Sequence, residues 1–407
     1  MSNIGTWMQR IGQDWIVLTQ LTHNNATAVG AVMALQFGPQ ILLLPLTGFA
    51  ADHFEKKKIL LTTQASMGMV ALVLGILNLT GVIQLWHVFI LAFLHGCAAA
   101  FDSPARQSFV SELVGEETLS NAVALNSTSF NSARMIGPAI AGVLIASVGA
   151  GWVFIINAVS FGAVLCSLCF LKVEKLHRKD RVNKKAGSLL DGFRYIWKRP
   201  GLRTVMTMLL LIGTFGLNFP IFISTMAVTV FHAGPRAFGL LTSAMAVGSV
   251  IGALLSAKRE KPSLQVLLAG SAMFGTGLSI AAIMPNYFLF GLALIAVGIS
   301  VQTFTTTANG FVQLSTEPFI RGRVMAIHLA IALGTTPIGA PLVGWVADRF
   351  GPRWALAVGA LGGILAALIG LTYLVRHRGM RLSYESNRLR MTIDQESNDS
   401  LVEALDK

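Results

Sequence analysis

Charged side chains are scarce in this sequence. Asp, Glu, Lys and Arg make up 12% of its 407 residues, whereas 54% of the residues are hydrophobic and the mean hydropathy is +0.65. Because soluble domains carry about a quarter charged residues, this composition excludes an ordinary soluble enzyme.

The sequence also lacks the short motifs that carry common chemistry. It contains no GxxxxGK phosphate loop, no zinc-protease motif and no nucleophile elbow. We therefore expect neither an enzyme nor ATP hydrolysis by this chain, so uphill movement of a solute would need an ion gradient or another subunit. Three cysteines lie in apolar segments, and no His or carboxylate joins Cys166 and Cys169 on their shared helix face, so no metal or other cofactor is expected.

Long apolar runs fill most of the chain and are typical of membrane-spanning helices. We predict an all-α membrane protein with twelve spans, near residues 2–21, 28–51, 59–80, 84–106, 119–147, 151–171, 202–228, 236–257, 263–284, 287–310, 322–347 and 353–375.

The basic residues predict the orientation of these spans. With twelve spans, 26 of the 31 Lys and Arg residues fall on one side, which the positive-inside rule assigns to the cytoplasm. Both termini are then cytoplasmic. The net charge of +12 is explained by this topology, so we expect a lipid bilayer rather than nucleic acid as the partner.

A basic segment divides the chain into two six-helix bundles. We predict bundles over residues 1–171 and 202–375, a cytoplasmic linker over 172–201 and a polar cytoplasmic tail over 376–407. The stretch LLDGFRYIWKRP in the linker alternates apolar and basic residues at helical spacing, which predicts an amphipathic helix on the membrane face.

An internal repeat supports the two halves. A shift of 202 residues aligns Phe109–Trp152 with Phe311–Trp354 without a gap, so the spans near 119–147 and 322–347 are predicted counterparts. The strings GFAADHFEKKK and GWVADRFGPRW also share a frame, and nine predicted spans separate Asp52 from Asp348. The two aspartates are therefore expected on opposite sides of the membrane, as inverted repeats require.

Charged residues inside predicted spans are the first candidates for function, because ionisable groups in a bilayer are costly. Arg10 and Asp14 lie four residues apart on one helix face, and Arg134 lies near the middle of another span. We interpret Asp14 as a carboxylate that Arg10 or Arg134 neutralises and that changes protonation during transport, with Asp102 near a cytoplasmic helix end as a further candidate. A fixed ion pair between the two spans is an equally weighted alternative.

Other polar and aromatic residues are candidates for a substrate cavity. His95 could titrate near neutral pH, although a lone histidine among small residues is more often a packed polar group. The run GISVQTFTTTANG is unusually polar for a span, and Asn218 beside Pro220 predicts a break in the backbone hydrogen bonds of its span. The cavity candidates are Trp7, His95, Phe215, Asn218, Phe219, Gln302, Thr303, Thr306 and Asn309.

Taken together, these features resemble the major facilitator superfamily. Gly48, Asp52, Lys57 and Lys58 fit its signature in the loop between the second and third spans, where His53 replaces the usual arginine. DSPARQSFVSELV and NAVALNSTSFNSARMIGPAIAG resemble the enterobactin-exporter-like branch, the transmembrane secretion effectors.

The resemblance implies a cavity bounded by the first, fourth, seventh and tenth spans, alternating access and proton antiport. It also implies that the loop carrying Gly48, Asp52, His53, Lys57 and Lys58 is a cytoplasmic gate. Superfamily members usually have further residues before SNIGTWMQR, so the first span is expected to be truncated at its N-terminus.

We therefore predict a secondary active exporter of small amphipathic molecules, acting as a monomer with protons and a small-molecule substrate as partners. Two alternatives stay open: an importer of a polar solute, and a decayed transporter that serves as a membrane scaffold or sensor.

Overall fold

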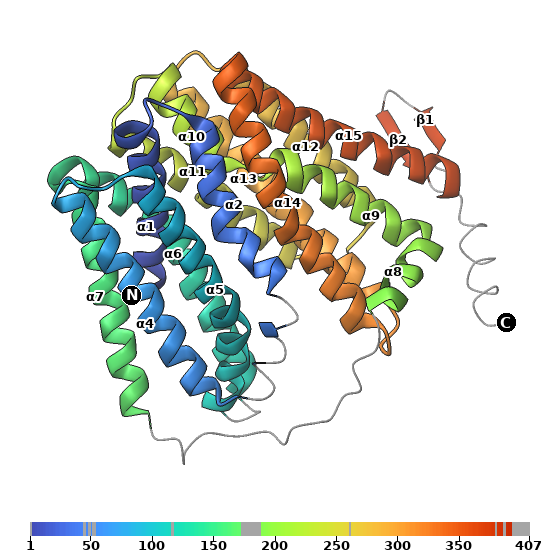
Figure 1. The fold of residues 1–407 in the computed structure, drawn as a ribbon. Coiled ribbons are helices and arrows are strands. Elements are labelled where there is room, and N and C mark those ends of the chain that lie inside the picture. The colour runs from blue at the N-terminus through green and yellow to red at the C-terminus, as the bar shows by residue number, and fades with distance from the viewer. Residues whose placement is uncertain are drawn as a thin grey trace.

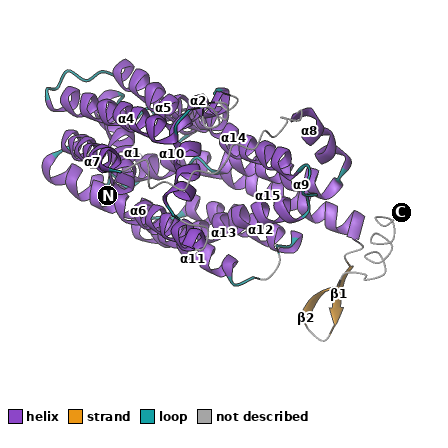
Figure 2. Cartoon of the chain, turned by 90° about the horizontal axis from the view of Figure 1, so that it is seen from below, coloured by secondary structure: helices purple, strands orange, loops and turns teal. Residues whose placement is uncertain are grey.

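A computed structural model describes residues 2–43, 46–47, 50, 54–114, 118–171, 189–259, 262–378, 381–385 and 388–392. Nearly all of these residues are helical, and the long helices run side by side (Figures 1 and 2). Towards the C-terminus, β1 (Arg381–Glu385) pairs antiparallel with β2 (Arg388–Thr392), where the sequence indicated only a polar tail.

The first half of the chain contains α1 (Ser2–Ile16), the π-helical turn η1 (Val17–Leu21), α2 (Ala26–Leu42), α4 (Lys56–Leu79), α5 (Leu85–Leu113), α6 (Leu119–Val148) and α7 (Ala150–Phe170). The second half contains α8 (Leu189–Lys198), α9 (Pro200–Leu211), the π-helical turn η4 (Ile212–Gly216), α10 (Phe219–Thr225), the π-helical turn η5 (Met226–Val230), α11 (Pro235–Ala257), α12 (Leu264–Ile283), α13 (Tyr287–Leu314), α14 (Arg321–Phe350) and α15 (Pro352–Arg378).

The fold class predicted from the sequence is confirmed. Within the described residues, ten helical segments are long and apolar enough to cross a membrane, and Ala26–Leu42 is a shorter apolar helix. The count of twelve spans stays a prediction, because the first helical segment carries Arg10 and Asp14 and α2 has only 17 residues. The predicted domain boundaries also stay predictions, since residues 172–188 lie outside the described residues.

The internal repeat appears in the structure as a constant offset. Both ends of α14 lie 202 residues after the corresponding ends of α6, and each helix has 30 residues. Each ends at a glycine with positive φ, 92° at Gly149 and 103° at Gly351, a conformation that side chains with a Cβ rarely adopt. The predicted equivalence of these two helices is therefore seen in the backbone itself.

The two halves meet where long helices of one half pack against the other. α2 packs on α14, and α6 packs on α11. Backbones approach so closely that a methyl group at Gly30 would lie 2.4 Å from the carbonyl oxygen of Ala340, and one at Gly142 would lie 2.6 Å from that of Pro235. Small residues thus allow a close fit along this seam.

These contacts gather towards one side of the molecule. We name the side with the linker-proximal ends of α7 and α9 the linker side, and the opposite side the far side. On the far side, the Asp348 carboxylate at the end of α14 accepts hydrogen bonds from the backbone nitrogens of Ala26 and Thr27, at 2.6 and 2.8 Å. It also accepts one from the Thr27 hydroxyl at 2.5 Å. A carboxylate at a helix N-terminus is favourable, so Asp348 closes the halves on the far side.

On the linker side the same helices carry exposed apolar side chains. Leu125 in α6 is 71% exposed, and Leu254 in α11 is 62% exposed. Within the described residues no hydrogen bond or ion pair joins the halves at these ends, and Figure 1 shows the linker-side ends of α4 and α5 apart from those of α8 and α14. The halves are thus in contact on the far side and separated on the linker side.

The amphipathic linker helix predicted from the sequence is α8. Its Ile196 is buried, and Asp191 lies 3.6 Å from Arg323 at the start of α14. Tyr195 donates a hydrogen bond to the Glu317 carboxylate, which also pairs with Arg199. These contacts fix α8 against the second half, while Leu190, Phe193 and Trp197 stay exposed.

Candidate transport site

A cavity of about 200 Å³ lies between the two halves. Its walls come from α1, α2 and α6 of the first half and from α10, α11, α14 and the adjoining Leu217 of the second. The lining residues are Trp7, Arg10, Ile11, Asp14, Met33, Gln36, Phe37, Arg134, Leu217, Phe219, Pro220, Ile223, Phe238, Thr242, Met245, Ala246 and Thr336. Since both halves contribute, any motion between the halves changes this cavity.

Three charged side chains from the predicted set line this cavity together. Asp14 is 7% exposed and shares the α1 face with Arg10, one helical turn away. Among the described residues, the Asp14 carboxylate forms no ion pair within 4.0 Å and no side-chain hydrogen bond. In this conformation Asp14 is therefore close to positive charge without being locked to it.

The two arginines are held by other groups. The Arg10 guanidinium lies 4.8 Å from the ring centre of Trp7 and 5.5 Å from that of Phe37. The Arg134 guanidinium lies 6.0 Å from the Trp7 ring and donates a hydrogen bond to the Ser249 hydroxyl across the seam, at 3.3 Å. The cavity thus combines cations with aromatic faces, an arrangement that attracts both charged and apolar parts of a ligand.

α1 is positioned by a row of polar contacts on its buried side. Asn157 in α7 donates a hydrogen bond to Gln9 at 2.6 Å, and Gln36 in α2 donates one to Gln13 at 3.0 Å. These bonds fix the rotation of α1, because turning the helix would leave buried amides without partners. The rotation in turn directs Arg10 and Asp14 to the cavity.

Several predicted cavity residues lie elsewhere. Phe215 packs towards Gly362 of α15, and Asn218, which is fully buried, donates to the Thr214 carbonyl oxygen at 2.7 Å. The predicted break beside Pro220 does occur, because residues 217 and 218 separate η4 from α10. Phe219, which begins α10, lines the cavity.

The predicted residues of α5 and α13 do not line this cavity. His95 is buried in α5, and its Nδ1 has no hydrogen-bond partner among the described residues. In α13, Gln302 donates to Thr306 at 3.1 Å, Thr303 is buried, and Thr306 and Asn309 are exposed. Gln36, Phe238 and Thr336 also line the cavity and were not predicted. Of these only Gln36 stands out in the sequence, as a polar residue in an apolar helix.

Asp102 belongs to a separate cluster at the linker side. It is 4% exposed, pairs with Arg106, and accepts hydrogen bonds from Thr63 at 3.0 Å and Gln64 at 2.7 Å. Arg106 also donates to Asn3 at 3.3 Å, so the cluster ties α4 and α5 to the start of α1. Its full set of partners is typical of a structural group.

Of the predicted gate residues, Gly48, Asp52 and His53 lie outside the described residues. Lys57 donates to the Leu171 carbonyl oxygen at 2.8 Å, at the end of α7, and Lys58 lies 3.2 Å from Glu55. Both contacts stay within the first half, in keeping with halves that are apart on the linker side.

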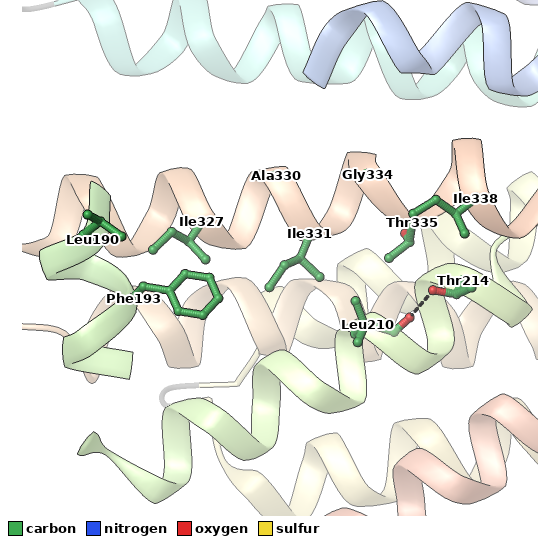
Figure 3. Close-up of a pocket in the computed structure, with 10 residues that line it drawn as sticks. All are labelled: Leu190, Phe193, Leu210, Thr214, Ile327, Ala330, Ile331, Gly334, Thr335 and Ile338. Atoms are coloured by element: carbon green, nitrogen blue, oxygen red, sulfur yellow. Dashed lines mark hydrogen bonds between the residues drawn. The ribbon is translucent and has the colours of Figure 1, made fainter. Parts of the chain in front are cut away.

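A second, apolar groove of about 440 Å³ lies between α8, α9 and α14, as Figure 3 shows. Ile327, Ile331 and Ile338 project into it from α14, and Phe193 faces them from α8. Thr335 lines this groove whereas Thr336 lines the central cavity, so α14 separates the two spaces.

Comparison with known proteins identifies the family. Residues 1–401 match the model of the family described as transmembrane secretion effector. The chain belongs to that family. It is therefore a multi-pass transporter of the cell membrane, a member of the major facilitator superfamily, and the predicted resemblance is confirmed.

Relatives across the superfamily are similar over nearly the whole chain. The Staphyloferrin A transporter of Staphylococcus aureus is 27% identical over 94% of this chain and 96% of its own length. The enterobactin exporter of Shigella flexneri is 25% identical over 90% and 87%, respectively. In fold, the chain is similar to a bacterial homologue of the human lysosomal transporter Spinster, with a TM-score of 0.72 at 12% identity, covering 91% of this chain and 94% of that one.

Proposed function

We propose that this transporter exports small amphipathic molecules from the cytoplasm in exchange for protons, by alternating access. The observation that carries the proposal is the cavity between the halves, in which the Asp14 carboxylate faces two arginines and several aromatic rings. A membrane-buried carboxylate without a fixed partner is a suitable proton carrier, because both of its charge states can be reached without breaking an ion pair.

The orientation supports export. The linker side carries most of the basic residues, so the positive-inside rule assigns it, with both termini, to the cytoplasm. The open side of the structure then faces the cytoplasm, from which an exporter loads its substrate. The loop with Gly48, Asp52 and His53 would close this side in the opposite state, with Lys57 and Lys58 exchanging their present contacts.

The charges suggest how protons and substrate could be coupled. Arg10, Arg134 and Asp14 together give the cavity one net positive charge, and protonation of Asp14 leaves two. A change of one unit charge in a small, partly dry space alters the affinity for a charged or polar ligand strongly. Each charge state of Asp14 would thus favour a different occupant, and the difference in affinity drives the switch between states.

The substrate class is supported by the lining and by the relatives. Trp7, Phe37, Phe219 and Phe238 supply flat apolar faces, while the arginines supply hydrogen-bond donors. The relatives named as a Staphyloferrin A transporter and an enterobactin exporter support a small-molecule substrate. The chain is expected to work as a monomer, because each monomer contains a complete cavity.

Inside-out vesicles test the coupling with Asp14→Asn. Ethidium and a catechol-bearing amphipath serve as probes, with and without an imposed pH gradient. We expect the variant to lose gradient-driven accumulation while keeping gradient-independent exchange of a probe across the membrane. Asp191→Asn is the matched control: it removes a carboxylate of α8 that lies away from the cavity, and its exposed contact with Arg323 contributes little to stability, so the variant should keep gradient-driven accumulation.

Other outcomes would point to other functions. Full gradient-driven accumulation by Asp14→Asn would refute the coupling role. Uptake of a polar solute into intact cells that depends on the protein would favour the importer, and no flux of any probe would favour a scaffold or sensor.

A further inference from the structure

A recess of about 280 Å³ lies at the linker-side ends of α9 and α15, next to α8 and away from the central cavity. Two arginines face it, Arg203 from the start of α9 and Arg376 from the end of α15. Trp197, Tyr373 and hydroxyl groups of three threonines complete most of its wall.

The two arginines have no acidic partner in the described part of the chain. Arg203 lies 5.8 Å from the ring centre of Trp197, and neither it nor Arg376 forms an ion pair with another described residue. The neighbouring Arg199, in contrast, is paired with Glu317. Two cations that converge without a carboxylate leave a positive site that an anion would neutralise.

The position of the recess relates it to the bilayer surface. Arg203 lies in the first turn of the span Pro200–Val230, and Arg376 is the last residue of the span Pro352–Arg376. Trp197 is 64% exposed, and exposed tryptophans with basic residues gather where helices leave a membrane. The arginines are therefore expected at the level of the lipid head groups.

An apolar strip continues from the recess towards the middle of the membrane. Leu368, about two turns before Arg376, is 50% exposed. Ile369 lines the recess itself. A molecule with a negative head and a hydrocarbon chain fits both parts, whereas a free anion would use only the arginines.

We propose that this recess binds an anionic glycerophospholipid of the cytoplasmic leaflet. The phosphate accepts hydrogen bonds from Arg203 and Arg376, and one acyl chain lies against Ile369 and Leu368. The lipid then joins α8 to the ends of α9 and α15, so it stabilises the linker helix in its place on the second half. This site is independent of the transported substrate.

Lipid-dependent stabilisation of the full-length protein in detergent tests the proposal. The melting temperature is followed during titration with phosphatidylglycerol, phosphatidylcholine or soluble glycerol phosphate. We expect saturable stabilisation by phosphatidylglycerol, and little effect of the other two. In Arg203→Gln/Arg376→Gln the apparent affinity for phosphatidylglycerol should fall about thirtyfold, because each basic residue near an anionic surface contributes about 1 kcal/mol.

Matched variants separate a specific site from general charge. Lys258→Gln/Arg259→Gln removes two exposed basic residues at the end of α11 and should keep the affinity of wild type. Arg203→Lys/Arg376→Lys keeps the charge and should keep part of the binding. Arg376→Gln alone provides the test if the double variant does not fold.

Three results would overturn the proposal. The first is that Lys258→Gln/Arg259→Gln loses as much affinity for phosphatidylglycerol as Arg203→Gln/Arg376→Gln. The second is that phosphatidylcholine stabilises the protein as much as phosphatidylglycerol does. The third is that glycerol phosphate alone stabilises the protein to the same extent. A loss of lipid affinity with unchanged probe exchange in vesicles would support the lipid site without bearing on the proposed function.

Discussion

Replacing Asp348 should shift the balance between the two states of the transporter. In the structure its carboxylate, from the second half, accepts three hydrogen bonds from Ala26 and Thr27 at the start of α2 in the first half. These bonds exist only while the far side is closed. Asp348→Ala therefore destabilises this state relative to the state that opens on the far side.

The magnitude follows from the number and exposure of these bonds. Hydrogen bonds to a charged group contribute about 1.5–3 kcal/mol when protected from water. Asp348 is exposed and water replaces the lost partners, so we expect about 1–2 kcal/mol for the whole contact. This corresponds to a five- to thirty-fold shift, roughly, towards the state with an open far side. Asp348→Asn, which keeps an acceptor oxygen, should have a smaller effect.

Distances between spin labels measure this shift. Val82 and Tyr287 lie on the far side, one in each half, and both are exposed. In a background without native cysteines, labels at these positions should give a longer-distance population that grows in Asp348→Ala. Arg349→Ala, which changes an exposed neighbour of Asp348, is the control. An unchanged distance distribution in Asp348→Ala would show that the contact does not hold the far side closed.

Three further predictions follow from the seam, the Asp102 cluster and the cavity. Gly142→Leu should also favour the open far side, because even a methyl group would lie 2.6 Å from the carbonyl oxygen of Pro235; labels at the same two positions report it, and a wild-type distribution would contradict it. Asp102→Ala should lower the free energy of unfolding by about 2–3 kcal/mol, because Thr63, Gln64 and Arg106 each lose a partner. The folded variant should retain gradient-driven transport. Loss of coupling at wild-type stability would instead assign Asp102 a role in transport. Trp7→Ala should raise the KM for aromatic probes several-fold with a smaller change in the maximal rate, and an unchanged KM would remove Trp7 from the binding surface.

The sequence predicted those parts of the fold and site that depend on strong local signals. Apolar runs identified the helices, and a repeat with a constant shift predicted that α6 and α14 are equivalent. Arg10, Asp14 and Arg134 stood out because a charge inside an apolar run has few explanations. These three residues do line one cavity.

Other parts depended on tertiary contacts that no local pattern encodes. Thr306 and Asn309 make α13 unusually polar for a membrane span. The sequence does not show whether this polar face is directed to the cavity, and in the structure both residues are exposed. In the sequence Phe238 is one of many apolar residues in its span. It lines the cavity because α11 packs against α6 of the first half. Likewise, the repeat identified Asp348 as the counterpart of Asp52, but it did not reveal that Asp348 binds the start of α2.

The glycine-rich seam has a consequence for how the protein responds to ionic strength. Where Gly30 faces Ala340 and Gly142 faces Pro235, backbone lies against backbone, and no ion pair has to be broken there when the halves separate. Dissolved salt screens charges but leaves such contacts almost unchanged. Concentrated salt at the far side should therefore weaken the Asp348 contact far more than the glycine seam, so that ionic strength there would change how readily the far side opens.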